Sequence, residues 1–248
     1  MTASTDSFLA RLGKSGAQVC LVHGDLVLAE PAAVRAAEAL AAAHGLPPDR
    51  IETHRHPSSL APVLQDLRTY SLFGGAKVLL VVDTAVFADR NAAAGLIDEA
   101  GEALPLSSPK TGDTALGARE RQAASRLLQA LHLFDANPAA STPERVLSAL
   151  PAWAFEGDRR GRGGKARGKK QVEELRAGLA VLLEAAVREG IQGMGEGDLA
   201  QLADAIRGGL PEGHALVLAE RSVAADHPVV RLLQEREAVL SVGSVEAE

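Results

Sequence analysis

Short apolar runs in this chain are followed by stretches in which apolar residues recur every three or four positions. The apolar runs predict strands at 19–23, 50–54, 78–82, 214–219 and 238–242. The helical spacing predicts helices at 30–44, 60–67, 198–207 and 228–235. Strands that alternate with helices are typical of βαβ units. We therefore expect an α/β fold whose first and last blocks share one parallel sheet flanked by helices.

Proline and polar residues indicate where these helices begin. Pro31 is suited to the first turn of the helix at 30–44, because a helix does not use the N–H that proline lacks there. Asp198 is expected to cap the helix at 198–207, since its carboxylate can accept hydrogen bonds from free backbone amides.

The pattern changes between the two α/β blocks. Residues 90–117 are rich in Gly, Ser, Pro and Ala and show little periodicity. Helical spacing then predicts helices at 118–134 and 143–153, and an amphipathic stripe from Val172 to Val187. We expect a discontinuous α/β domain formed by 1–90 and 196–248, with a largely helical insertion at 91–195.

A Gly-rich basic loop at 157–170 lies within the insertion. From Arg159 to Lys170 it contains seven basic residues and no acidic residue; the seven are Arg159, Arg160, Arg162, Lys165, Arg167, Lys169 and Lys170. Positive charges on a Gly-rich tether can neutralise phosphates, so these residues are candidate DNA-binding positions. A solubilising loop is the alternative, and no aromatic residue is interleaved for base stacking. Outside these seven residues the chain has 19 basic against 32 acidic residues, a net charge of about −13, which disfavours nonspecific DNA binding by the rest of the chain.

Composition narrows the class of protein further. Aromatic residues make up only 3% of the chain, so the core must be built mainly from Ala, Leu and Val. Cys20 is the only cysteine, which excludes a disulfide framework and favours a small buried thiol in a reducing cytoplasm. The first residues lack the pattern of a signal peptide, and no apolar run reaches the length of a membrane span.

The strand that ends at Asp83 resembles the Mg²⁺-holding strand of nucleotide hydrolases. That chemistry also needs a phosphate loop with Lys and Ser or Thr after the first strand. Here Asp25 and Glu30 follow the first strand instead, and their carboxylates repel phosphates. We expect a nucleotide-hydrolase-like scaffold without a nucleotide site or cofactor, in which Asp83 is a turn residue at the strand end.

Other catalytic and metal-binding patterns are weak. His54 and His56 lie on one side of an extended segment, but no convincing third ligand is close in sequence, so solvated histidines are favoured over a metal site. The sequence contains no nucleophile elbow, and we expect no catalytic site.

The segment from Ser71 to Gly75 reads Ser-Leu-Phe-Gly-Gly and runs into a strand that is apolar throughout. The two glycines close a turn directly after Leu72 and Phe73. These two side chains either point outward, as an anchor for an apolar pocket of a partner, or cover the local core.

Three segments together resemble the delta subunit family of the bacterial DNA polymerase III clamp loader. They are Leu-Val-His-Gly-Asp at 21–25 with its helix, the segment 71–83, and the strand–helix–strand at 214–242. The resemblance covers 17–90 and 196–246. It implies a RecA/AAA+-like fold without a working ATP site.

The resemblance also implies a function in DNA replication. In that family a Leu-Phe pair enters the apolar pocket of the ring-shaped sliding clamp and opens the ring, without hydrolysing ATP itself. This role falls to Leu72 and Phe73, with Ser71, Gly74 and Gly75 shaping the loop. The implied partners are the sliding clamp (beta) and, through collar domains, the gamma or tau and delta prime subunits. Polymerase activity would belong to the assembled holoenzyme.

The chain departs from the family in two respects. The insertion at 91–195 has no counterpart in the family's first domain. The family also continues into a small helical domain and a helical collar that this sequence lacks, so we expect a shortened or split delta subunit.

Two alternative functions stay open. One is a nucleotide hydrolase with an unorthodox phosphate site at Asp83, and the other is a nucleic-acid adaptor that acts through Arg159–Lys170.

Overall fold

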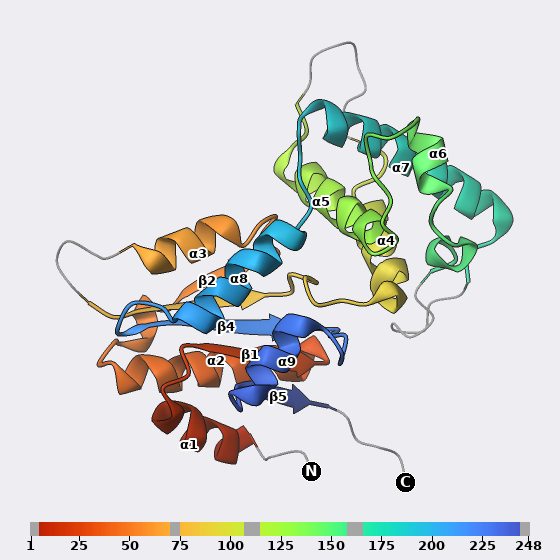
Figure 1. The fold of residues 1–248 in the computed structure, drawn as a ribbon. Helices are drawn as coiled ribbons and strands as arrows, with labels where there is room; N and C mark the ends of the chain where they lie inside the picture. The colour runs from red at the N-terminus through yellow and green to blue at the C-terminus, as the bar shows by residue number, and fades with distance from the viewer. Residues whose placement is uncertain (1–4, 70–74, 107–114, 158–165, 244–248) are drawn as a thin grey trace, which may run out of the picture. The chain divides into compact units, whose positions relative to one another are not determined.

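The computed structural model describes residues 5–69, 75–106, 115–157 and 166–243. Two compact units make up the chain (Figure 1). Unit 1 contains Met1–Phe87 and Glu196–Glu248, and unit 2 contains Ala88–Gly195. The sequence-based division set its boundaries at 90 and 196.

A five-stranded parallel sheet forms the centre of unit 1. Its strands are β1 (Val19–Gly24), β2 (Glu52–Arg55), β3 (Lys77–Val82), β4 (His214–Glu220) and β5 (Val239–Val242). Their order across the sheet is β2-β3-β4-β1-β5, and every neighbouring pair is parallel. The predicted fold class, a RecA/AAA+-like parallel sheet flanked by helices, is confirmed.

Helices cover both faces of this sheet. They are α1 (Thr5–Ser15), α2 (Leu26–Ala43), α3 (Ala61–Arg68), α8 (Glu196–Gly208) and α9 (Pro228–Glu235). The crossover from β1 to β2 through α2 runs across the sheet toward its β2 edge. The crossovers through α3, α8 and α9 run in the opposite direction, toward the β5 edge. Right-handed crossovers therefore put α2 on one face and the other three on the second face, while α1 packs against α2 (Figure 1).

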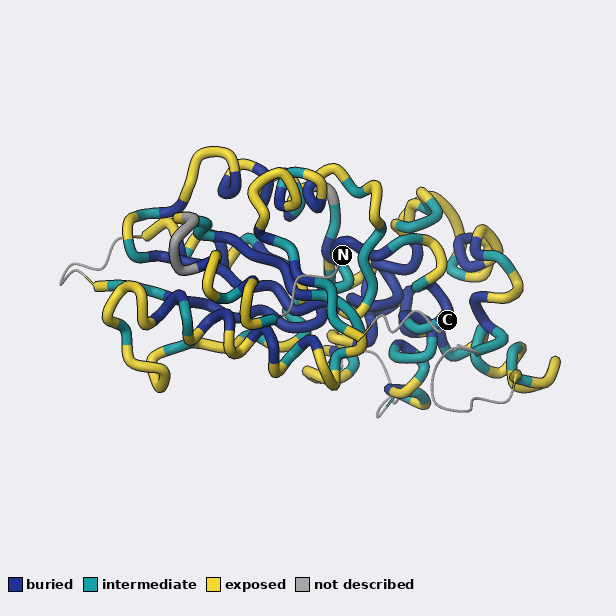
Figure 2. Tube along the Cα trace, turned by 90° about the horizontal axis from the view of Figure 1, so that it is seen from below, coloured by how far each residue is buried: buried dark blue, intermediate teal, exposed yellow. Residues whose placement is uncertain are grey.

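The middle strands carry the core of unit 1. Every residue of β4 is buried, and so is every residue of β3 after Lys77 (Figure 2). Because helices shield both faces, these strands are apolar throughout and do not alternate with polar residues. Cys20 lies in β1 and is fully buried, and burial raises the pKa of its thiol to about 12.

Unit 2 is helical within 88–106, 115–157 and 166–195, which are its described residues. Its helices are α4 (Ala93–Gly101), α5 (Ala118–His132), α6 (Pro143–Leu147) and α7 (Lys169–Arg188), with 3-10 turns η2 (Arg90–Ala92) and η3 (Ala152–Phe155). Helix α5 packs against α4 and α7, and α6 packs against α7. The helix expected at 143–153 is interrupted, because Pro151 cannot continue it and a separate 3-10 turn follows.

Two expected helix starts are wrong. Helix α2 begins at Leu26, because Asp25 caps it by accepting a hydrogen bond from the Val27 amide at 3.0 Å; Pro31 therefore lies inside the helix. Asp198 is the third residue of α8 and does not cap it. Its carboxylate bonds to the start of α3 instead.

Two helices were not predicted. Helix α1 buries Phe8 and Leu12, and α4 buries Leu96, Ile97 and Ala100, all at helical spacing. In the part of the chain that the structure describes, no helix is both long and apolar enough to cross a membrane.

Candidate functional site

The connection between α3 and β3 lies at the amino edge of the sheet, and the structure describes both of its ends. Helix α3 ends at Arg68 with Thr69 as its C-cap, and β3 begins at Lys77. The Thr69 amide donates to Asp66 at 3.2 Å, and its hydroxyl donates to the carbonyl of Gln65 at 2.8 Å. The helix therefore ends in a regular, hydrogen-bonded turn.

Strand β4 and the segment before it hold both ends of this connection. The Nδ1 of His214 donates to the carbonyl oxygen of Leu67 at 2.7 Å, and His214 is only 2% exposed. The Lys77 amide donates to Gly213 at 3.1 Å. The Lys77 ammonium also pairs with Asp66 of α3 at 2.7 Å, so the last turn of α3 is tied directly to the start of β3.

Helix α8 holds the other end of α3. One carboxylate oxygen of Asp198 accepts hydrogen bonds from the amides of Leu60 and Ala61, at 2.6 and 3.1 Å, and from the Ser59 hydroxyl at 2.7 Å. The carboxylate thereby binds free amides at the helix start and complements the positive end of the helix dipole. Helix α3 is thus fixed at both ends by elements distant in sequence.

The predicted clamp-binding residues fall largely in the gap between these ends. Ser71, Leu72, Phe73 and Gly74 lie outside the described residues. Gly75 is exposed, has a φ of 134°, and would have no atom within 4 Å of an added Cβ. Its backbone conformation, rather than a close neighbour, is what favours glycine here.

The carboxyl edge of the sheet is where open parallel sheets commonly bind ligands, at the point where the crossovers diverge. That point lies between β1, which leads to β2, and β4, which leads to β5. The start of α2 at this edge is capped by the Asp25 carboxylate. Glu30, one turn further, pairs with Arg55, which lowers the pKa of that carboxyl. Carboxylates thus stand where a nucleotide site would need phosphate-binding groups.

Asp83 follows β3 at the same edge and is nearly buried. Its carboxylate lies 2.9 Å from Arg221 and 3.3 Å from the Nδ1 of His56. His56, Asp83 and Ala85 have φ values of 48°, 57° and 56°, which are unusual for residues with a side chain. Strained backbone therefore gathers where β2 and β3 end.

Glu220 ends β4 beside Asp83 and is fully buried. Its carboxylate accepts hydrogen bonds from the amides of Thr84 and Ala85, at 3.2 and 2.9 Å, and from the Thr84 hydroxyl. Burial raises the pKa of Glu220 to about 7, although the bond from Thr84 acts in the opposite direction. These bonds tie the turn that leaves β3 to the end of β4.

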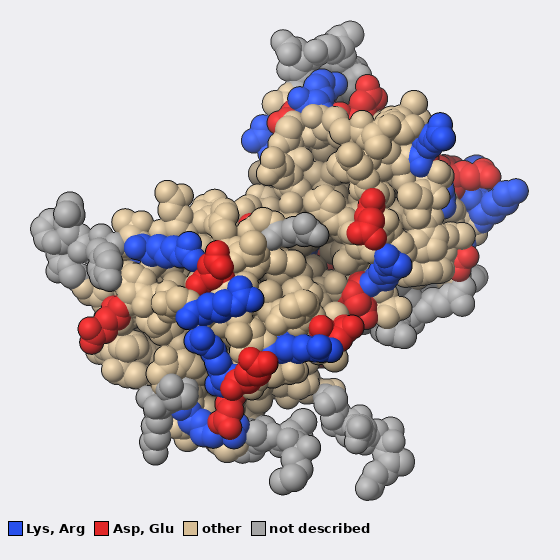
Figure 3. Space-filling view, viewed as in Figure 1, with Lys and Arg blue, Asp and Glu red and all other residues tan. Residues whose placement is uncertain are grey.

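No group of three or more His, Cys, Asp or Glu side chains that could hold a metal occurs among the described residues. On the face drawn in Figure 3, the described basic and acidic side chains lie interspersed.

Sequence reasoning missed the roles of Asp198, His214 and Glu220, because the sequence carries no local signal of their distant partners.

The basic loop is described only at its ends. Arg159, Arg160, Arg162 and Lys165 lie outside the described residues. Arg167 pairs with Asp98 of α4. Lys169 and Lys170 are exposed in the first turn of α7, where Lys170 lies 3.8 Å from Glu174.

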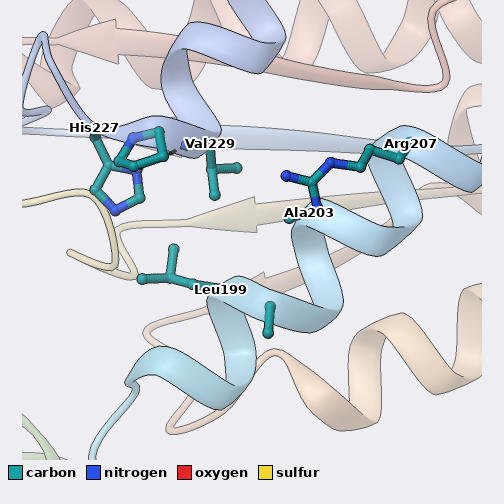
Figure 4. A pocket seen from close by; sticks show the side chains of 7 residues that line it. Leu199, Ala203, Arg207, His227 and Val229 are labelled. Atoms are coloured by element: carbon teal, nitrogen blue, oxygen red, sulfur yellow. Dashed lines mark hydrogen bonds between the residues drawn. The ribbon is translucent and has the colours of Figure 1, made fainter.

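A cavity of about 340 Å³ lies between α8 and the start of α9 (Figure 4). It is lined mainly by apolar side chains, with Arg207 and His227 as its polar members. The His227 ring contacts Phe87 edge-on, with 5.3 Å between centroids, and burial lowers the pKa of its imidazole.

These features define an α/β domain of the RecA/AAA+-like type whose central strands β3 and β4 are separated in sequence by a helical insertion. No family model, curated protein or solved structure matches the chain.

Proposed function

We propose that this chain is a delta-like clamp-loader subunit that binds a ring-shaped sliding clamp through Leu72 and Phe73 and opens it. The observation that carries the proposal is the Ser-Leu-Phe-Gly-Gly motif at 71–75, which joins the end of α3 to the start of β3. A Leu-Phe pair in such a connection would enter an apolar pocket of the clamp. Burying two such side chains stabilises a complex by about 3–6 kcal/mol before ordering costs.

The contacts at the two ends of the connection support this role. The bond between His214 and Leu67 and the ion pair between Lys77 and Asp66 fix the points where the connection leaves and rejoins the domain. Fixed ends reduce the conformational freedom that is lost on binding, which favours affinity.

The carboxyl edge supports a role that does not require ATP hydrolysis by this chain. Asp25 caps α2 where a phosphate loop would offer amides to a nucleotide. The added Cβ of any residue other than glycine at position 24 would also lie 1.9 Å from the carbonyl oxygen of Val242, so this turn is closed against β5. Energy for clamp loading would then come from other subunits.

The test is binding of the full chain to the sliding clamp of the same organism, measured by titration calorimetry. We expect the double variant Leu72→Ala, Phe73→Ala to lose measurable binding. The matched control is Val27→Ala, Leu28→Ala, which removes two exposed apolar side chains, 66% and 51% exposed, from α2 of the same unit. The control should bind like the wild type.

The same titration distinguishes the alternatives. Wild-type binding that both double variants retain would overturn the assignment of the Leu-Phe pair. A folded wild-type chain that does not bind the clamp would overturn the proposed function itself. Heat on titration with ATP and Mg²⁺ would favour the nucleotide-hydrolase alternative instead.

A further inference from the structure

The residues that line the cavity between α8 and the start of α9 all belong to unit 1. Leu199, Ala203 and Arg207 follow one another at four-residue spacing, so they lie along one face of α8 (Figure 4). Eight residues of helix span about 12 Å, which is the length of this row. Because Ala200 and Ala203 have small side chains, the space between the two helices is left open.

The cavity is apolar at its floor. Ala203 of α8 and Val229 of α9 are only 7% and 6% exposed, and they form the deepest part of the lining. Leu199 is half-buried beside them, and Pro228 is exposed at the rim. Sites for small molecules commonly have volumes of about 300–1,000 Å³ and a mainly apolar lining. The volume of about 340 Å³ therefore fits a small ligand with an apolar body.

Arg207 provides a positive charge at one end of the cavity. In Figure 4 its side chain extends over the cavity toward Val229. Its guanidinium lies 3.9 Å from the Asp204 carboxylate, which is beyond hydrogen-bond distance, and the two side chains are 66% and 70% exposed. An exposed pair of this kind contributes little and leaves the N–H donors of the guanidinium available. A planar guanidinium with available donors suits a carboxylate, which can accept two parallel hydrogen bonds.

His227 provides a hydrogen-bond donor at the other end. Its Nδ1 accepts from the Val229 amide at 3.3 Å and so caps α9, while the ring contacts Phe87 edge-on. Burial lowers the pKa of this imidazole, although the charge of Asp226 acts in the opposite direction, so the ring is neutral at pH 7. A neutral ring whose Nδ1 accepts carries its proton on Nε2. No hydrogen bond to Nε2 is formed within the described part of the chain, so this N–H can donate to a ligand.

We propose that this cavity binds a small organic acid with an apolar body. The carboxylate of the ligand pairs with Arg207, and its apolar body lies on Ala203 and Val229. An oxygen at its far end accepts a hydrogen bond from Nε2 of His227. An apolar lining with a few placed polar groups is the usual composition of a small-molecule site. The inference does not depend on clamp binding by the Leu72–Phe73 motif, since no residue of that motif lines the cavity.

The test is titration of the isotope-labelled full chain with para-hydroxyphenylpropionate, followed by the amide resonances in NMR spectra. We expect saturating shifts at α8 and at the start of α9, with a dissociation constant of about 1 mM, which is ordinary for so small a molecule. Two probes of the same shape vary the charge. The uncharged para-hydroxyphenylpropionamide should bind more weakly than the acid, and the cation tyramine should not bind.

Variants then test the individual contacts with the same acid. Arg207→Gln removes the charge and should weaken binding by about 5- to 10-fold. Arg231→Gln is the matched control, because Arg231 is an exposed arginine of α9 that does not line the cavity, and it should bind like the wild type. Ala203→Leu fills the floor and should abolish binding. His227→Asn keeps a side chain that can cap α9 but shortens the donor, so it should weaken binding mildly.

Three results would overturn the proposal. One is equal affinity for the acid, its amide and tyramine, which would mean that the charge of Arg207 is not used. Another is a set of shifts that lies outside α8 and the start of α9. The third is the absence of shifts at acid concentrations well above the expected dissociation constant. If Ala203→Leu loses its helical circular dichroism, the comparison of Arg207→Gln with Arg231→Gln decides the question.

Discussion

The carboxylate of Asp198 lies 2.6 Å from the backbone nitrogen of Leu60, although the two residues are 138 positions apart. Asp198 stands in the first turn of α8, directly after the chain returns from unit 2, and Leu60 precedes the first residue of α3. The element that follows the insertion thereby fixes the helix that leads to the Leu72–Phe73 motif.

Removal of this carboxylate should destabilise unit 1. Asp198→Ala leaves the buried amide of Leu60 and the half-buried amide of Ala61 without their acceptor, so we expect a loss of about 2–3 kcal/mol in the free energy of unfolding. Asp198→Asn keeps an oxygen acceptor and should therefore lose less of the free energy of unfolding than Asp198→Ala. Urea denaturation measures both, with Asp204→Ala, an exposed carboxylate on the same helix, as control. Equal stability of Asp198→Ala and Asp204→Ala would contradict the prediction.

Glu220 should make stability depend on pH. Its pKa is raised from 4.5 in the unfolded chain to about 7 in the fold, so the folded protein binds more protons between these values. Its contribution to stability is therefore full below about pH 4.5 and is lost as pH rises through about 7, by on the order of 3 kcal/mol.

Substitution of Glu220 by Gln tests this dependence. Glu220→Gln cannot ionise, so its free energy of unfolding should fall less than that of the wild type between about pH 5 and pH 8. Glu212→Gln removes an exposed carboxylate before the same strand and should keep the wild-type slope. Parallel curves for wild type and Glu220→Gln would show that Glu220 is not responsible.

Gly24 should tolerate no side chain. A Cβ there would lie 1.9 Å from the Val242 carbonyl oxygen, and its φ of 140° is strained for other residues. Gly24→Ala must separate β1 from β5 and should cost about 3 kcal/mol or more. Gly45→Ala is the matched control, since its φ is also positive, at 67°, but nothing lies within 4 Å. It should cost only about 1–2 kcal/mol, as measured by thermal unfolding.

The ion pair between buried Arg126 and half-buried Glu99 in unit 2 offers a fourth test. The Nε of Arg126, whose side chain is 5% exposed, lies 2.9 Å from Glu99. Glu99→Ala leaves a buried guanidinium without this carboxylate and should destabilise unit 2 by about 2–3 kcal/mol. Trp153 fluorescence during denaturation reports on this unit, and Glu102→Ala, an exposed carboxylate nearby, is the control. An unchanged transition in Glu99→Ala would contradict this expectation.

The sequence predicted the sheet because its strands are buried on both faces and are therefore apolar throughout, as β3 and β4 show. Helix ends were less predictable. Pro31 suggested the first turn of a helix, because proline is favoured at that position. The helix instead begins at Leu26, four residues earlier than expected, because Asp25 caps it.

Contacts between distant residues could not be predicted. Asp198 matched the local rule for a cap, yet it caps a different helix. Glu220 reads as an ordinary strand-end carboxylate until β3 is placed beside β4. Trp153 was included in the helix predicted at 143–153, and its exposure follows only from the 3-10 turn that begins after Pro151.

The strand order also governs how the domain can form during synthesis. Strand β4 pairs with both β1 and β3, whereas β2, among the described strands, has β3 as its single neighbour. Until the ribosome has made residue 220, β1 therefore lacks both of its partners, β4 and β5, and β2 and β3 form an isolated pair. The whole of unit 2 emerges during this interval. During synthesis the apolar strands of the first block therefore stay exposed until β4 has been made. Strand β4, which completes the sheet, lies more than a hundred residues after β3 in the sequence.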